Sequence, residues 1–240
     1  MTERADRGGT RDGTAGSAPD GPRVGSDEAG KGPVLGPMVA AAVRAPPDAI
    51  PDDVDDSKRL SGAKRESIAA ALREGGTVER GVAVVPTDRI DDPGTDMNSL
   101  TVAAHAEAVA AVATERDRVV ADAGDGDAAR VARRVGDGVS ERGGGSVDVP
   151  AEHGAGGTDP PGAAASGGGK GERAAPDDAL DDDYPDRGPV GSGYPSDPVT
   201  REFLRRYVGD TGELPDCARA SWATAEDVLA AAEQSSLSEF

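Results

Sequence analysis

Apolar positions from Arg23 onward switch between short runs and helical spacings, a pattern that predicts strands followed by helices. Apolar runs predict strands over 34–44, 77–85, 118–121 and 147–149. Apolar residues spaced three or four apart predict helices over 61–73, 98–115, 126–135, 199–208 and 224–235. Because strands and helices alternate through the first half of the chain, the expected fold class is α/β with a mixed central sheet.

Two segments depart from this pattern. Residues 1–22 contain no Val, Ile, Leu or aromatic residue, which predicts a disordered tail. Residues 151–179 lack every large apolar residue type, and eight glycines fall within 154–171, so this stretch is predicted to be a flexible linker. The expected organisation is a tail over 1–22, an α/β domain over 23–190 with a Gly/Pro/Asp-rich stretch over 151–189, and a helical region over 191–240.

Composition and charge narrow the class of protein. The chain carries 45 acidic against 26 basic residues, a net charge of −19, and only four of the basic residues are lysines. This balance is typical of proteins adapted to molar salt, where the Debye length is about 3 Å and an acidic surface no longer repels nucleic acid at range. The single cysteine, Cys217, excludes a disulfide framework. No apolar run approaches a membrane span and Met1 opens a polar stretch, so we expect a cytoplasmic protein without a membrane segment.

The strongest candidate for a functional site in the sequence is the glycine-rich stretch 25–37. Asp27 and Glu28 are adjacent acids that follow an apolar strand start. Neighbouring side chains on a regular strand point to opposite faces, so we expect both to reach one site only where the strand ends or bends. Two such carboxylates are unfavourable together unless a cation lies between them. The alternative is a turn with two solvated acids.

Asp122 is a second candidate, because it follows the apolar strand 118–121. Open α/β sheets place functional sites at strand ends, although an aspartate here could instead cap the helix 126–135. Three carboxylates at two strand ends offer the oxygen ligands that hard divalent cations prefer. A pair of such ions about 3.5–4 Å apart is a common arrangement for hydrolysing phosphodiesters.

Seven blocks of the chain, in order, resemble ribonuclease HII, and more narrowly its salt-adapted archaeal branch. They are GSDEAGKGPVLGP (25–37), DDSKRLS (55–61), DRIDDPGTDMNSLTVAAHAEAV (88–109), VVADA (119–123), AEHGA (151–155), GSGYPSDPVTREFL (191–204) and LPDCARASWAT (214–224). The resemblance implies a ribonuclease-H-like fold with a mixed sheet, flanking helices and a C-terminal helical region. It also implies a monomeric endonuclease that cuts the RNA strand of RNA–DNA hybrids, or at ribonucleotides embedded in duplex DNA.

The same resemblance assigns site residues. Asp27, Glu28 and Asp122 match three of the family's four catalytic acids, which hold two Mn²⁺ or Mg²⁺ ions. The substrate-binding positions it implies are Gly30, Lys31, Gly32, Ser57, Lys58 and Tyr194. The first three match a Gly-Arg-Gly loop whose backbone reads the ribose 2′-hydroxyl, the group that separates RNA from DNA. Tyr194 matches a tyrosine that stacks near that ribose, or is simply a turn aromatic. Ser57 and Lys58 match a loop that contacts backbone phosphates.

The chain departs from the family pattern at the fourth acid, where Gly156 stands in place of an aspartate. The segment 156–175 has also lost the family's large apolar residues. Asp159, three positions on, is an alternative fourth acid, although the two prolines that follow it disfavour this. His153 is read as an aid to product release or as a surface residue, and His105 as packing or surface. Three readings stay open: an active enzyme with three acids, a relative that binds hybrids but cleaves poorly, and an acidic α/β scaffold without a site.

Overall fold

The fold is described from a computed structural model, which covers residues 22–46, 78–121, 127–150, 161–162, 164–166, 180 and 183–237. Several sequence predictions fall outside these residues and are not tested by the structure: the tail as far as residue 21, the helix over 61–73, and the site residues Ser57, Lys58, Asp122, His153, Gly156 and Asp159. No described helix is long and apolar enough to cross a membrane.

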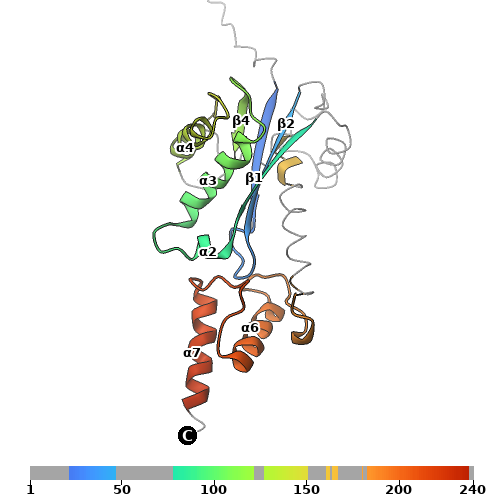
Figure 1. The fold of residues 1–240 in the computed structure, drawn as a ribbon, viewed down its shortest axis with the longest axis vertical. Helices are drawn as coiled ribbons and strands as arrows, with labels where there is room; N and C mark the ends of the chain where they lie inside the picture. The colour runs from blue at the N-terminus through green and yellow to red at the C-terminus, as the bar shows by residue number, and fades with distance from the viewer. Residues whose placement is uncertain are drawn as a thin grey trace, which may run out of the picture.

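Within the described residues, one four-stranded sheet forms the centre of the fold (Figure 1). Its strands are β1 (Arg23–Ala29), β2 (Met38–Ala45), β3 (Glu79–Val85) and β4 (Arg118–Ala121), in the order β3-β2-β1-β4. β1 is antiparallel to β2 and parallel to β4, and β2 is antiparallel to β3. The mixed sheet that the sequence predicts is therefore confirmed.

Helices cover one face of this sheet. α3 (Met97–Ala110) packs on β1, β2 and β3, and α4 (Ala128–Glu141) packs on the outer side of α3 (Figure 1). The short helix α2 (Thr87–Ile90) follows β3. Backbone lies against backbone at Gly81, where an added Cβ would stand 2.0 Å from the Ala108 carbonyl oxygen. The sheet and α3 enclose a core built mostly of valine and alanine, as the small supply of large apolar residues predicts.

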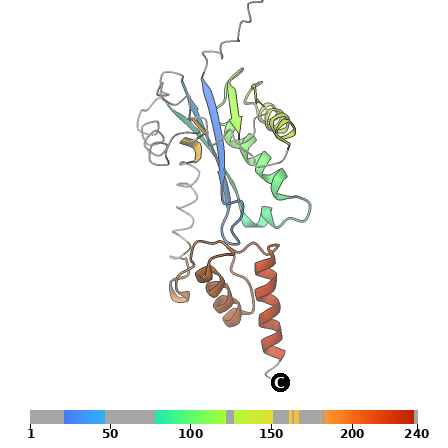
Figure 2. The same ribbon diagram turned by 180° about the vertical axis from the view of Figure 1, so that it is seen from behind.

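A second core lies at the end of the sheet where β1 leads into β2 (Figure 2). It is formed largely by α6 (Pro198–Thr211) and α7 (Ala223–Leu237), and the 3₁₀ turn η4 (Pro185–Arg187) contacts α6. Val34 and Leu35 of the β1–β2 loop are fully buried in this cluster beside Phe203 and Leu204. The loop therefore joins the sheet to the C-terminal helices.

This arrangement corrects several predicted boundaries. The strand predicted over 34–44 begins only at Met38, because the apolar Val34 and Leu35 pack among the C-terminal helices instead. The strand predicted over 147–149 is reduced to a single bridge between Arg118 and Asp148. α3 ends before residue 115, α4 extends beyond residue 135, and α2 was not expected.

The structure differs from the predicted linker at residues 161–162 and 164–166. The described residues of this segment are helical, and Ala164 and Ala165 are buried. Gly25 explains how a segment without large side chains can pack, since a Cβ at Gly25 would stand 1.9 Å from the Gly162 nitrogen. The helical turn thus lies directly on the backbone of β1, and close contact of small residues replaces large apolar groups.

Candidate active site

Asp27 and Glu28 lie among the last three residues of β1, which ends at Ala29 just before Gly30 with its φ of +85°, as the expectation of a strand end requires. The strand continues to Ala29, with Asp27 opposite Ala41 and Glu28 opposite Ala40 on β2. Their side chains accordingly meet different neighbours on the two faces of the sheet. The two acids remain adjacent through the backbone, where the Glu28 N–H donates to Asp27 Oδ1 at 2.9 Å.

On the α3 face, Glu28 contacts His105, a fully buried residue of that helix. The distance from His105 Nε2 to Glu28 Oε2 is 3.1 Å, and that from His105 Nδ1 to Ser26 Oγ is 2.7 Å. An ionised carboxylate only accepts, so Nε2 must carry the proton in this pair. One Glu28 oxygen is thereby fixed, while among the described residues the other accepts no hydrogen bond.

The hydrogen bonds that run from Glu28 through His105 to Ser26 are consistent with two protonation states of His105. Ser26 Oγ also lies 3.0 Å from the Ala41 carbonyl oxygen. If the imidazole is neutral, Ser26 donates to the bare Nδ1. If the imidazole is charged, Nδ1 donates to Ser26, which then donates to Ala41. In both states Nε2–H faces Glu28, so the carboxylate keeps the same partner.

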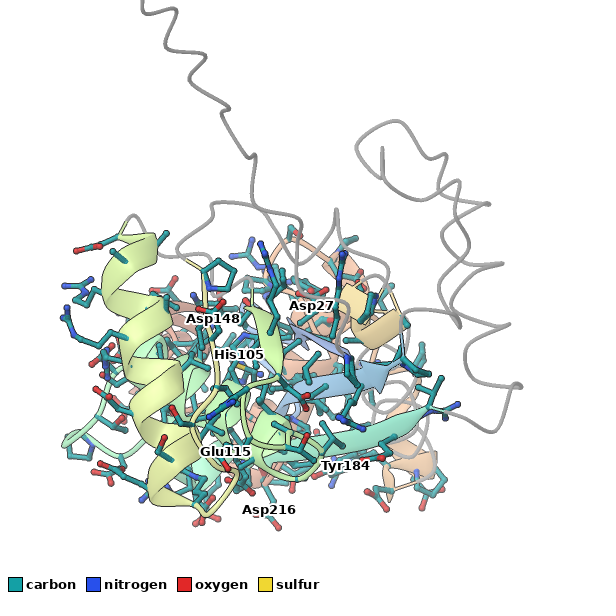
Figure 3. All side chains as sticks on the ribbon, turned by 90° about the horizontal axis from the view of Figure 1, so that it is seen from above. Asp27, His105, Glu115, Asp148, Tyr184 and Asp216 are labelled. Atoms are coloured by element: carbon teal, nitrogen blue, oxygen red, sulfur yellow. The ribbon has the colours of Figure 1, made fainter. Side chains whose placement is uncertain are left out.

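Asp27 faces the helical turn of residues 161–166. Ser166 hydrogen-bonds its carboxylate, and burial together with the neighbouring Glu28 charge nevertheless raises the Asp27 pKa. Figure 3 shows Asp27 and His105 near each other at the middle of the molecule. No basic side chain of the described residues forms an ion pair with Asp27. A partly buried carboxylate without a cationic partner is an arrangement that a divalent cation would relieve, so the acids present fit a metal.

The strand that leads to Asp122 is placed as the sequence predicts. β4 covers the predicted residues 118–121 and pairs in parallel with β1, so that Ala121 lies beside Ser26, the residue before Asp27. Asp122 itself lies outside the described residues. Among those that are described, no group of three or more His, Cys, Asp or Glu side chains is placed to hold a metal ion.

The structure brings together Tyr194 and the loop of residues 30–32. Gly30 has a φ of +85°, which favours glycine, and the exposed Gly32 lies beside the Tyr194 ring, whose Cε1 would be 3.6 Å from a Cβ at that position. Tyr194 is 42% exposed. Lys31 Nζ donates to Asn98 Oδ1 at 3.2 Å. Of the predicted substrate-binding residues that the structure describes, Gly32 and Tyr194 lie side by side and exposed, while Gly30 before them is buried.

Sequence reasoning missed four residues that support the site: Ser26, His105, Arg219 and Trp222. His105 was read as packing or surface; it is buried, as packing requires, and it also contacts a predicted catalytic acid, which was not expected. Arg219 is also fully buried, and it holds the carbonyl groups of the loop that starts at Gly30. The only signal in the sequence was their position within blocks that resemble the family, because the side-chain hydrogen-bond partners of His105, Arg219 and Trp222 lie 77 or more positions away.

Comparison with known proteins identifies the family. The family model for ribonuclease HII matches residues 24–225, most of the chain. The chain belongs to the ribonuclease HII family. Ribonuclease HII of Halobacterium salinarum is 53% identical over 218 residues, which cover 91% of this chain and 99% of that protein. Ribonuclease HII of Haloarcula marismortui is likewise 53% identical, with 91% and 100% covered.

Solved structures agree with the assignment to ribonuclease HII. The crystal structure of ribonuclease H2 from Pyrococcus horikoshii OT3 matches with a TM-score of 0.73 and 29% identity, over 89% of this chain and 99% of that one. The ribonuclease HII in a PCNA complex from Archaeoglobus fulgidus matches with a TM-score of 0.66 and 32% identity, over 86% and 96%. The predicted ribonuclease-H-like fold, with its mixed sheet and flanking helices, is thereby confirmed.

Proposed function

We propose that this ribonuclease HII family member is an endoribonuclease that hydrolyses the RNA strand of RNA–DNA hybrids, or cuts at a ribonucleotide within duplex DNA. The observation that carries this proposal is the adjacency of two features on one strand and its following loop. Asp27 and Glu28 supply partly buried carboxylates, and the loop from Gly30 to Gly32 leads from them to the exposed ring of Tyr194.

The acids are proposed to hold two divalent ions, Mn²⁺ or Mg²⁺, through Asp27, Glu28 and Asp122. Divalent ions in such a site supply an activated water and stabilise negative charge on the leaving oxygen. The chain's own contribution is to fix the ligands. His105 holds one oxygen of Glu28 and leaves the other available, while Ser166 orients Asp27. The register of β4, which ends beside Ser26, supports Asp122 as the third acid.

Recognition of the ribonucleotide is proposed to lie in the loop of residues 30–32 and in Tyr194. A 2′-hydroxyl oxygen needs a donor close to the sugar, and backbone N–H groups of an exposed glycine-containing loop can approach it without side-chain hindrance. Tyr194 offers an exposed ring beside the same loop for contact with the sugar. Lys31, where the family pattern has arginine, keeps the charge but not the planar guanidinium.

Gly156 cannot ligate a metal through a side chain, so we propose an enzyme that runs on three acids at a reduced rate. The alternative within this family is a relative that binds hybrids without efficient cleavage. Ser57 and Lys58 stay predicted phosphate contacts, and the monomeric state stays a prediction.

A second partner is suggested by one solved relative. The Archaeoglobus fulgidus ribonuclease HII was solved in complex with PCNA and shares the fold of this chain. We propose that this protein also binds the PCNA of its own organism. Co-elution of the two proteins from a sizing column in molar KCl would support this, and separate elution at micromolar concentration would contradict it.

The test of the main proposal is strand cleavage of a labelled DNA duplex with one ribonucleotide, in about 2–3 M KCl with Mn²⁺ or Mg²⁺ and an EDTA control. We expect metal-dependent cutting at the ribonucleotide. Asp27→Asn, Glu28→Gln and Asp122→Asn should each lower the rate by about 10²-fold or more, since loss even of groups that only orient ligands costs 10–100-fold. Asp227→Asn, an exposed position on α7, serves as the matched control.

The outcomes of this assay distinguish an active enzyme, a relative that only binds hybrids, and a protein without the proposed function. Undiminished cleavage in all three acid variants would contradict the assigned site. No cleavage by the unmodified protein, with the ribonucleotide duplex still bound in preference to all-DNA duplex, would favour the binding-only alternative. Equal binding of both duplexes without cleavage would contradict the proposed function altogether.

A further inference from the structure

Arg219 and Trp222, in the segment between α6 and α7, hold the β1–β2 loop by its main-chain carbonyl groups. The Arg219 guanidinium, 0% exposed, donates to the carbonyl oxygens of Gly30 at 2.6 Å, Lys31 at 3.2 Å and Gly36 at 2.9 Å. The Trp222 indole N–H donates to the Gly32 carbonyl oxygen at 3.3 Å. Two side chains thus hold three consecutive carbonyl groups, those of residues 30, 31 and 32.

The two side chains also support each other. The Arg219 guanidinium lies over the Trp222 ring, with Cζ 4.9 Å from the ring centroid. The Arg219 N–H donates to the Val34 carbonyl oxygen at 2.8 Å, which anchors the segment to the same loop. A buried arginine is costly unless its donors are satisfied. An apolar side chain could fill the same space without that cost, so the arginine's contribution is the orientation of the carbonyl groups.

Holding the carbonyl groups fixes the direction of the amide groups. In a trans peptide the C=O of one residue and the N–H of the next point in opposite directions, and no described peptide bond is cis. With the carbonyls of Gly30 and Lys31 turned toward Arg219, the N–H groups of Lys31 and Gly32 turn away from it. Within the described part of the chain neither N–H has an acceptor, and Gly32 is exposed beside Tyr194.

We propose that Arg219, supported by Trp222, is a positioning residue that sets the amide groups of Lys31 and Gly32 as a fixed pair of donors for the 2′-hydroxyl oxygen of the substrate ribonucleotide. This inference rests on the proposed function and adds the C-terminal segment to it as a determinant of specificity. Donors that are fixed before binding lose little conformational entropy when the ribose arrives. The segment acts through the loop and does not itself touch the reacting atoms.

The test compares affinity for two duplexes that differ by one hydroxyl group. Kd is measured by fluorescence anisotropy in molar KCl with EDTA, for a duplex with one ribonucleotide and for the same duplex as all DNA. Trp222→Phe removes one carbonyl contact and keeps a ring under the guanidinium, while Arg219→Lys keeps the charge and loses the fork. We expect the preference for the ribonucleotide to fall by about threefold in Trp222→Phe and about tenfold in Arg219→Lys, with the affinity for all-DNA duplex unchanged.

Arg187→Met is the matched control. Arg187 also lies over an aromatic ring in this region, 5.4 Å from the centroid of Tyr207, and forms an ion pair with Asp210, but is not among the residues that bond the loop. The Arg187→Met variant should prefer the duplex with a ribonucleotide to the same extent as the unmodified protein. If Arg219→Lys fails to fold, as near-UV circular dichroism would show, Trp222→Phe alone carries the test.

The outcomes separate this inference from the proposed function. Folded variants that keep the full preference would overturn the inference and leave the proposed function intact. An equal loss of affinity for both duplexes would show that Arg219 and Trp222 have only a structural role, and this result would also overturn the inference. If the unmodified protein has no preference for the ribonucleotide, the proposed function fails first and this inference fails with it.

Discussion

The Asp27 carboxyl lies where burial and the charge of Glu28 both oppose its ionisation, and its pKa is raised as a result. The folded state therefore holds the Asp27 proton more tightly than the unfolded chain does. Stability contributed by this group is present at low pH and is lost as pH rises through its folded-state pKa. At neutral pH, without metal, the raised pKa of Asp27 thus lowers the free energy of unfolding.

Asp27→Asn removes this penalty, and we expect the metal-free variant to be more stable than the unmodified protein at pH 7. Thermal unfolding in molar KCl with EDTA measures the difference, where each kcal/mol corresponds to a midpoint shift of about 2–4 °C. At pH values below the ordinary aspartate pKa the advantage should vanish, because the carboxyl is then protonated in both states. Divalent ions should stabilise the unmodified protein more than the variant.

Asp88→Asn on α2 is the control for this prediction, since Asp88 is exposed and its substitution should leave the midpoint unchanged. A metal-free Asp27→Asn variant with a lower midpoint at pH 7 than the unmodified protein would contradict the argument. A higher unfolding midpoint of Asp27→Asn that persists at low pH would also contradict the argument, because it could not arise from ionisation of the Asp27 carboxyl.

The sequence allowed the adjacent acids Asp27 and Glu28 to be singled out, because they follow a strand start within a glycine-rich stretch. It did not reveal that His105 lies against Glu28. A histidine in an alanine-rich helix carries no local sign of its partner, and these two residues, 77 positions apart, are brought together only by packing of α3 on β1.

At the scale of elements, the helical turn of residues 161–166 depends on the absence of a side chain at Gly25. A Cβ there would stand 1.9 Å from the Gly162 nitrogen and 2.2 Å from the Pro161 carbonyl carbon, both backbone atoms that cannot rotate away. Ser166 at the end of this turn hydrogen-bonds Asp27. Packing at Gly25 is therefore coupled to the orientation of a proposed metal ligand.

Gly25→Ala should displace the turn, lower cleavage activity by about tenfold or more and weaken metal binding, because a misplaced supporting group typically costs 10–100-fold. Mn²⁺ titration calorimetry and the cleavage assay measure the two effects. Gly209→Ala in α6 is the matched control, since a Cβ there meets nothing within 4 Å and alanine favours the helix by about 1 kcal/mol. Full activity with unchanged metal affinity in Gly25→Ala would contradict the coupling.

Periodicity predicted elements well where the pattern is local and poorly where the partner is distant. β4 has the predicted bounds and β3 nearly so, because alternating or continuous apolar residues suffice to define them. Val34 and Leu35 look like strand residues but belong to the C-terminal core. The turn at 161–166 was predicted as linker because its packing depends on a glycine about 137 residues earlier in the chain.

At the scale of the whole molecule, a net charge of −19 on 240 residues dominates the dependence on solvent. At 0.1 M salt the Debye length of about 10 Å lets acidic groups repel one another across the surface, whereas at 1 M it shrinks to about 3 Å. A net stability of about 5–15 kcal/mol, typical of a protein of this kind, is small enough for such repulsion to decide whether the chain is folded.

The ion pair between Arg44 and the buried Asp117 can be compared with the surface charges, because salt should screen the two to different extents. Its Nε–Oδ2 distance is 2.7 Å, and Asp117 also accepts from the Thr114 N–H at 2.8 Å. Because Asp117 is buried, salt screens the pair far less than it screens surface charges. Asp117→Asn should therefore lower the free energy of unfolding by about 3 kcal/mol at every salt concentration where the protein is folded.

We expect the midpoint of thermal unfolding to fall steeply as KCl is lowered from about 3 M to 0.1 M, with most of the change below 1 M, where screening of surface charge is incomplete. A change that instead continues in proportion to salt up to 3 M would point to exclusion of salt from apolar surface, the other route by which salts stabilise proteins. Circular dichroism of the unmodified protein and of Asp117→Asn across this range distinguishes the two. Parallel curves would show that screening acts on the surface and leaves the buried pair unaffected, whereas curves that diverge at low salt would contradict that division.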